Sequence, residues 1–253
     1  MIRAPVAVKN MNKPIRIYNH IYQDKDDTWI FILLDQMYEF ERSGLYENCE
    51  SITIVFIGKQ HKYKLLLDSI KPFQKVKVLC HTLIPEKEQN EIITLEEVHR
   101  DSMQSDHYIL YTHCKGVTAW SKYFQNNPSF FTNYYLWRKY LEWGCIEKWR
   151  ECINLLDTND VAGCNYNEGP LPHFSGTKWW SKSSYIRTLD NVYGEQQNQK
   201  LKEYQGNRFY AEFWPCSKTD KIGSIHNPPE YLRWPNQGIY SVPWTRGMYS
   251  RET

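Results

Sequence analysis

Residues 106–116 read Asp-His-Tyr-Ile-Leu-Tyr-Thr-His-Cys-Lys-Gly, and this stretch decides the fold class. The run from His107 to Thr112 is rich in β-branched and aromatic residues and is followed closely by a glycine, which predicts a buried strand. The strand ends in a polar cluster that contains His113 and Lys115. In open α/β sheets, ligands bind beyond the carboxyl ends of the strands. We therefore expect these two side chains at a ligand site, where a phosphate group would lie.

The chain before this strand alternates strands and helices. Strands are predicted at residues 15–20, 51–57 and 75–80, and helices at residues 28–42, 63–70 and 91–103. This alternation predicts an α/β fold with a mostly parallel central sheet flanked by helices and joined by right-handed crossovers. No GxGxxG follows the first strand and no GxxxxGK[ST] occurs. The sequence therefore argues against a dinucleotide site and excludes a P-loop kinase.

The second half of the chain is less regular. We expect helical structure over residues 129–156 with a break at Gly144, a strand at 160–165, short helices at 182–189 and 199–214, and a strand at 221–226. Residues 227–253 lack periodicity and are predicted to form an irregular tail. No linker rich in Pro, Gly and Ser divides the chain, so we expect one domain over residues 1–253.

Composition narrows the class of protein. A net charge of +2 over 253 residues argues against a dedicated nucleic-acid binder, which usually presents a strongly basic face. The 7 Cys are irregularly spaced and form no CxxC, which predicts buried thiols in a reducing compartment and no zinc site. No apolar leader and no run of about 18 apolar residues occur, so we expect a cytoplasmic protein with at most peripheral membrane contact.

Five motifs follow one another along the chain: Ile17-Tyr-Asn-His-Ile-Tyr-Gln23, Ser43-Gly-Leu-Tyr46, Tyr111-Thr-His-Cys-Lys-Gly116, His173-Phe-Ser-Gly-Thr-Lys-Trp-Trp180 and Arg208-Phe-Tyr-Ala-Glu-Phe-Trp214. In this order they resemble glycosyltransferases of the GT-A fold, above all uncharacterised proteins of this kind from bacteria and large DNA viruses. The His-x-Lys-Gly element is also similar to rhamnan-synthesis proteins.

The resemblance spans residues 15–226 and implies a GT-A-like, Rossmann-like sheet. It also implies a role in polysaccharide biosynthesis, in which a sugar moves from a nucleoside-diphosphate sugar to a hydroxyl of a glycan or glycolipid. Residues 15–116 would form the donor nucleotide half and residues 117–226 the acceptor half, followed by the tail.

The resemblance places the donor nucleotide between the end of the first strand and the start of the helix at 91–103. Tyr18 and His20 end the first strand, where Tyr18 would stack on the base and His20 would form a hydrogen bond. Glu91 and Thr94 begin the helix at 91–103, near the ribose. The alternatives are a core Tyr, a core His, and a capping box formed by Thr94 with Glu97.

GT-A enzymes usually carry Asp-x-Asp where this chain has His113-Cys-Lys115, and that motif holds a divalent metal ion against the donor diphosphate. A lysine repels hard divalent ions, which prefer oxygen ligands. Lys115 would instead neutralise the leaving diphosphate itself, and His113 would also contact the donor. Dependence on Mn²⁺ or Mg²⁺ stays open, with His113 and His226 as candidate ligands. The alternative is a strand-capping His113 and a solvated Lys115.

The segment that follows the strand at 160–165 would bind the acceptor. His173 and Ser175 can form hydrogen bonds with sugar hydroxyls, and the rings of Trp179 and Trp180 can stack on a pyranose. Gly176 permits a turn that other residues resist. The alternative is that the two Trp side chains anchor a loop in the core.

Glu212 is the predicted catalytic base, beside Lys115 as the second catalytic residue. Inverting glycosyl transfer needs a group that accepts the proton of the acceptor hydroxyl, and the resemblance places a carboxylate at this point of the chain. The alternative is a salt bridge from Glu212 to Arg208, four residues earlier on a helix.

Two other functions compete with sugar transfer. A non-catalytic carbohydrate-binding or scaffold module would keep the fold without the chemistry, and the missing Asp-x-Asp favours it. A nucleotidyltransferase would carry a Gly-rich loop after the first strand, and residues 20–24 contain no Gly.

Overall fold

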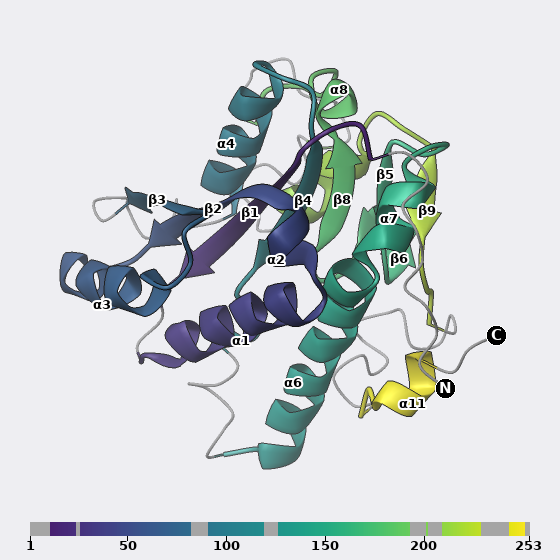
Figure 1. Cartoon of the computed structure of the whole chain (residues 1–253). Helices are drawn as coiled ribbons and strands as arrows, with labels where there is room; N and C mark the ends of the chain where they lie inside the picture. The colour runs from purple at the N-terminus through teal and green to yellow at the C-terminus, as the bar shows by residue number, and fades with distance from the viewer. Residues whose placement is uncertain are drawn as a thin grey trace.

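A seven-stranded sheet with helices on both faces is the framework of the protein (Figure 1). The structure is a computed structural model that describes residues 11–23, 26–81, 91–118, 126–192, 201, 209–228 and 243–250. The strands of the large sheet are β1 (Ile15–Tyr22), β2 (Cys49–Ile57), β3 (Val76–His81), β4 (Tyr108–His113), β5 (Val161–Gly163), β8 (Trp179–Lys182) and β9 (Ile222–Ser224). Two short strands, β6 (Tyr166–Asn167) and β7 (His173–Phe174), form a separate antiparallel pair.

The strand order is β3-β2-β1-β4-β8-β5-β9. Every neighbouring pair is parallel except those that involve β8, which runs antiparallel to both β4 and β5. The prediction of an α/β fold with a mostly parallel central sheet is confirmed. Strand β8 was not predicted, because its four residues carry no alternation of polar and apolar side chains.

Helices cover both faces of the sheet (Figure 1). On one face lie α1 (Thr28–Arg42), α2 (Leu45–Asn48), α3 (Gln60–Ile70), α6 (Pro128–Glu142) and α7 (Trp149–Leu155); on the other lie α4 (Ile92–Ser102), α8 (Ser183–Ile186) and α10 (Tyr210–Phe213). The bounds of α1 are those predicted. Helix α11 (Arg246–Tyr249) lies within the region predicted as an irregular tail, of which residues 229–242 fall outside the described chain. Residues 199–200 and 202–208 of the helix expected at 199–214 also fall outside the described residues.

The long helical stretch changes its winding where the sequence predicted a break. Helix α6 begins at Pro128 with the Asn127 side chain accepting a hydrogen bond from the Phe130 amide at 3.1 Å. It passes into a π-helical turn over Trp143–Glu147 before α7. A Cβ atom on Gly144 would lie 2.4 Å from Cys164 Sγ, so only glycine fits this contact. The turn therefore packs its backbone directly against the residue that follows β5.

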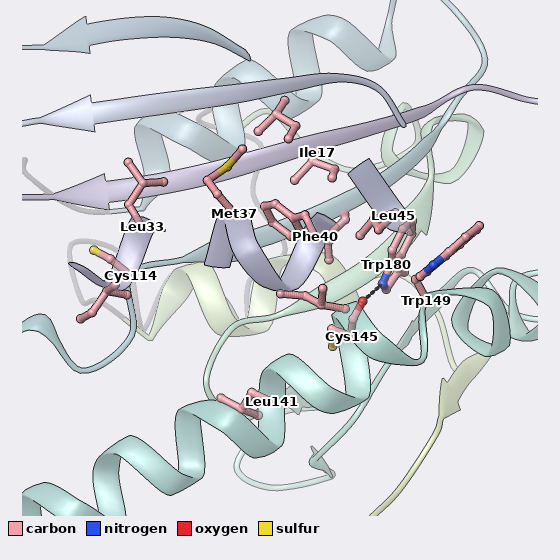
Figure 2. Packing of buried hydrophobic residues seen from close by; sticks show 14 of the residues in the cluster. Ile17, Leu33, Met37, Phe40, Leu45, Cys114, Leu141, Cys145, Trp149 and Trp180 are labelled. Atoms are coloured by element: carbon pink, nitrogen blue, oxygen red, sulfur yellow. Dashed lines mark hydrogen bonds between the residues drawn. The ribbon is translucent and has the colours of Figure 1, made fainter. Parts of the chain in front are cut away.

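Two groups of buried side chains form the core, one on each face of the sheet. Figure 2 shows part of the first, where Ile17 of β1, Phe40 of α1 and Trp180 of β8 pack together and Trp180 Nε1 donates to the Cys145 carbonyl at 2.7 Å. The second contains Tyr111 and Trp179, whose rings stack at 5.3 Å. Successive residues of a strand point to opposite faces, so each Trp of β8 fills a different half of the core. Within the described ranges, no helix has both the length and the apolar character that crossing a membrane requires.

Candidate active site

His20 and His113 lie side by side at the carboxyl ends of β1 and β4. They are register partners on two parallel strands, so both side chains point to the face covered by α4. There, His20 Nδ1 is 2.8 Å from Thr94 Oγ1, and His113 Nδ1 is 2.8 Å from Glu91 Oε1. The first turn of α4 thus supplies one partner for each imidazole.

Two side chains from the opposite face hold the backbone of His113. Its carbonyl oxygen accepts hydrogen bonds from Gln36 Nε2 of α1 at 2.8 Å and from Lys178 Nζ, just before β8, at 3.1 Å. Lys178 also donates to Thr112 Oγ1, and burial lowers the pKa of its amine to about 8. The end of β4 is therefore fixed from both faces of the sheet.

The Glu91–His113 pair has a defined charge state. Burial alone would raise the pKa of Glu91, but the hydrogen bond from His113, together with the nearby ammonium of Lys115, outweighs it and lowers the pKa to about 2. Burial lowers the pKa of His113 from its usual value against the opposing effect of Glu91. Near neutral pH the pair is a carboxylate and a neutral imidazole that donates its Nδ1–H.

This state leaves the other imidazole nitrogen of His113 as an acceptor. The Nε2 atom is buried and has no hydrogen-bond partner among the described residues. A buried polar atom without a partner costs about 1–3 kcal/mol. A ligand that brings a hydroxyl or N–H group to this nitrogen would recover that free energy. The neighbouring His20 is also neutral, because burial lowers its pKa to about 4.

Lys115 and Glu212 complete the charged part of the site. The ammonium of Lys115 lies 4.0 Å from Glu212 Oε1 and 4.8 Å from the centre of the Trp137 ring. Its side chain is 15% exposed, so Lys115 is not a solvated surface lysine. Gly116 follows with φ +94°, a left-handed conformation that glycine adopts readily. This glycine lets the chain turn directly after the lysine.

These groups line one polar cleft of about 210 Å³. Five residues predicted from the sequence meet there, although they are spread over the whole chain: His20, Glu91, His113, Lys115 and Glu212. Tyr134 of α6 closes the cleft beside Gly116. The predicted partner of Glu212, Arg208, lies outside the described residues.

The structure corrects two predictions for the donor half. Tyr18 is fully buried and donates its hydroxyl to Asp101 Oδ2 at 2.8 Å, so the prediction that it stacks on a nucleobase is wrong. Thr94 and Glu97 form no capping box, because α4 begins at Ile92 and Thr94 faces His20. Thr94 supports the cleft through His20 and does not line it.

The predicted acceptor residues form a tight turn beside the cleft. His173 Nε2 is 2.9 Å from Ser175 Oγ, which also accepts from Asn167 Nδ2 at 2.7 Å, so the two polar side chains satisfy one another. Gly176 has φ +93° and would place a Cβ 2.4 Å from Leu141 Cδ1. The turn permitted by this glycine is confirmed. None of the three residues that were predicted here, His173, Ser175 and Gly176, lines the cleft.

Trp179 and Trp180 do not bind a sugar ring in this structure. Both side chains are 0% exposed and belong to the core on either face of β8. Stacking on a pyranose needs a free ring face, and neither residue has one. The prediction that Trp179 and Trp180 bind the acceptor is therefore wrong. The alternative holds, because both side chains are anchored in the core.

His226 lies in a separate aromatic cluster. Its Nδ1 atom is 2.9 Å from the Tyr140 hydroxyl, and Tyr140 stacks on Trp244 at 4.8 Å. It is absent from the lining of the cleft that holds His113, so these two candidate metal ligands are not brought together. Among the described residues, no three His, Cys, Asp or Glu side chains gather in a way that would hold a metal ion.

Sequence reasoning missed Gln36 and Lys178. The signal for Gln36 was present, since it falls among Leu33, Met37 and Phe40 on the apolar face of α1. A polar residue on such a face must find a buried partner. Lys178 had no comparable signal, because its partners come from a strand more than 60 residues away, with a sequence separation of 66 to Thr112.

The fold and the site define an α/β protein with a polar cleft at the carboxyl ends of parallel strands. The chain belongs to the family described as "Domain of unknown function (DUF8361)", which matches residues 17–221. No curated protein matches the sequence.

Solved structures with a distant likeness to this chain include two enzymes. For 4-diphosphocytidyl-2C-methyl-D-erythritol synthase from Anaerococcus prevotii the identity is 10% and the TM-score 0.44, over 85% of this chain and 88% of that one. For mannose-6-phosphate isomerase from Helicobacter pylori the identity is 14% and the TM-score 0.38, over 85% and 98% of the two chains. At these values, neither likeness bears on what this protein does.

Proposed function

We propose that this protein is a glycosyltransferase that moves a sugar from a nucleoside-diphosphate sugar to a hydroxyl of a glycan or glycolipid. The observation that carries the proposal is the position of Lys115, a half-enclosed cation directly after β4, in a cleft that also holds His20, Glu91, His113 and Glu212. Ligands of α/β sheets bind at this edge of the sheet. The resemblance of the sequence motifs to GT-A enzymes supports the same reaction.

In this proposal Lys115 neutralises the diphosphate as it leaves. The bond between the sugar carbon and the phosphate oxygen breaks with its electron pair on the phosphate, and a fixed ammonium stabilises that developing charge. The ammonium of Lys115 lies 4.0 Å from Glu212 Oε1. The diphosphate would replace part of this interaction with stronger contacts to a doubly charged group.

Transfer also needs a group that accepts the proton of the acceptor hydroxyl. The sequence assigns this role to Glu212, which lines the cleft and faces Lys115. The same cleft holds a second candidate, His113, whose imidazole contacts Glu91. Among the described residues, the side chains of the cleft do not form a three-ligand set for a metal ion.

The proposal is tested by thermal shift of the full chain against nucleoside diphosphates and nucleotide sugars, with and without Mn²⁺, followed by assays of sugar transfer. A ligand at about 100 times its Kd stabilises the native state by about 2.7 kcal/mol. Stabilisation by a nucleoside diphosphate with turnover of a nucleotide sugar is the expected result. A protein stabilised by glycans but by no nucleotide is instead a carbohydrate-binding module.

A further inference from the structure

His113 is the one imidazole of the cleft with a buried nitrogen left without a described partner. Its Nδ1–H is committed to the Glu91 carboxylate at 2.8 Å, and a carboxylate can only accept. The neutral ring therefore carries its lone pair on Nε2, which is buried and unpaired. His20 differs, because its Nδ1 meets a hydroxyl, Thr94 Oγ1, that can either donate or accept.

The orientation of His113 is fixed by contacts on both faces of the sheet. Glu91 holds the ring from the α4 side, while Gln36 Nε2 and Lys178 Nζ hold the main-chain carbonyl from the other side, at 2.8 and 3.1 Å. The carbonyl also accepts from the amide of Lys115 at 2.8 Å. Groups that act in catalysis gain most from such rigid support.

Glu212 is a weaker candidate for the same proton. Its carboxylate is 4.0 Å from the ammonium of Lys115, so it already has a cation as its partner. It also lies on a helix of only 4 residues, Tyr210–Phe213. The contact orients Lys115, and that is the role the geometry supports for Glu212.

We infer that His113 Nε2, with Glu91 behind it, accepts the proton of the acceptor hydroxyl, in place of Glu212. This inference rests on the proposed transfer of a sugar from a nucleoside-diphosphate donor. As the oxygen of the acceptor bonds to the sugar carbon, its proton passes to Nε2 and the bond to the phosphate oxygen breaks with its electron pair on the diphosphate. Glu91 stabilises the imidazolium, which then releases its proton to water.

Charged and titratable groups surround this imidazole from each element packed against it. They are Glu91 at the start of α4, His20 on β1, Lys115 after β4, and Lys178 before β8. The two lysines oppose protonation of His113 and Glu91 favours it. A base in this setting is active when neutral, so kcat/KM should fall as the pH drops through the pKa of His113, below the usual value of about 6.5.

Three variants of the full chain test the assignment. We expect His113→Gln to lower kcat by roughly 10²–10⁴-fold, the usual contribution of a general base, with the affinity for the nucleoside diphosphate changed less than about threefold. Glu91→Gln keeps the shape but removes the negative charge that stabilises the imidazolium, and should lower kcat by roughly 10-fold or more. Glu212→Gln should lower kcat by no more than about tenfold. His61→Gln, on the exposed surface of α3, is the matched control for a histidine change.

A spectroscopic measurement separates the base role from a structural one. In ¹⁵N-histidine NMR of the wild-type protein, His113 should be neutral with a proton on Nδ1, and Glu91→Gln should lower its pKa further, because the carboxylate that favours the imidazolium is gone. A loss of 10²-fold or more in Glu212→Gln with little loss in His113→Gln overturns the inference while leaving the transferase function intact. A wild-type protein that turns over no nucleotide sugar overturns the proposed function, and the base role with it.

Discussion

His20 and His113 are register partners on neighbouring parallel strands, and each reaches a different residue on the first turn of α4. The pairing brings two neutral imidazoles to one end of the sheet, with Glu91 as the fixed charge behind one of them. Because the spacing of parallel strands is set by their backbone hydrogen bonds, the arrangement needs no flexible loop to bring the rings together. His20 and His113 therefore line the cleft from two fixed strands.

Replacing Lys115 by Ala should weaken binding of a nucleoside diphosphate by roughly 10–100-fold, because a charge-assisted hydrogen bond to phosphate contributes about 1.5–3 kcal/mol. Lys115→Arg keeps the charge and should retain most of the affinity. Isothermal titration at two ionic strengths measures both effects, and the wild-type affinity should fall with added salt more steeply than that of Lys115→Ala. Equal affinities for the wild type and Lys115→Ala would show that Lys115 does not contact the nucleoside diphosphate.

Replacing Trp180 by Phe should destabilise the protein without touching the cleft. The change removes the hydrogen bond to the Cys145 carbonyl and leaves a void in the core, at a cost of about 2 kcal/mol or more. For a chain of this size the melting temperature should fall by roughly 4–8 °C. Phe31→Leu is the control, since Phe31 is 66% exposed and should change little. An unchanged melting temperature with weaker glycan binding would instead indicate that the Trp180 ring stacks on a sugar.

Gly176→Ala should be among the most damaging small substitutions. Its φ of +93° is unfavourable for any residue with a Cβ, and the new atom would lie 2.4 Å from Leu141 Cδ1. Backbone strain and overpacking together should cost about 2–4 kcal/mol. Gly247→Ala is the matched control, because no atom lies within 4 Å of the added Cβ. Urea unfolding compares the two, and equal midpoints would contradict the expectation.

The free energy of unfolding should fall as the pH drops from about 6.5 to about 4. Burial lowers the pKa of His20 and of His107 to about 4, so in this window the unfolded chain binds protons that the native state does not. The loss is about 3 kcal/mol for the fully buried His20, and stability is level above pH 6.5 for these groups. His107→Asn, at the residue just before β4, should flatten part of the slope in denaturant titrations. An unchanged slope would show that His107 titrates normally.

The sequence predicted the sheet far better than it predicted the site. Alternation of apolar segments was enough for the first four strands and for the helix Thr28–Arg42, because each lies in one continuous stretch. Strand β8 was not predicted, since its four residues, which include two adjacent Trp, show no alternation of polar and apolar side chains. Two Trp beside a glycine suggested a ligand, but large buried rings are as typical of a core.

The cleft could be predicted only in part. His113 and Lys115 were found because a buried strand that ends in polar residues marks the edge of a sheet where ligands bind. The hydrogen bond from His113 to Glu91 spans 22 residues and the bonds from Lys178 span 65 or more. Such contacts depend on tertiary packing and on which face each residue occupies, and no local pattern encodes them.

The antiparallel strand β8 also has a consequence for the order of assembly during synthesis. It lies between β4 and β5, yet it follows both of them in the chain. A nascent chain that has not reached residues 179–182 cannot join the two parts of the sheet, and it leaves the apolar β4 with an unpaired edge. Open edges of this kind invite pairing with other chains. The edge of β4 is therefore paired only after the two tryptophans of β8 have emerged from the ribosome.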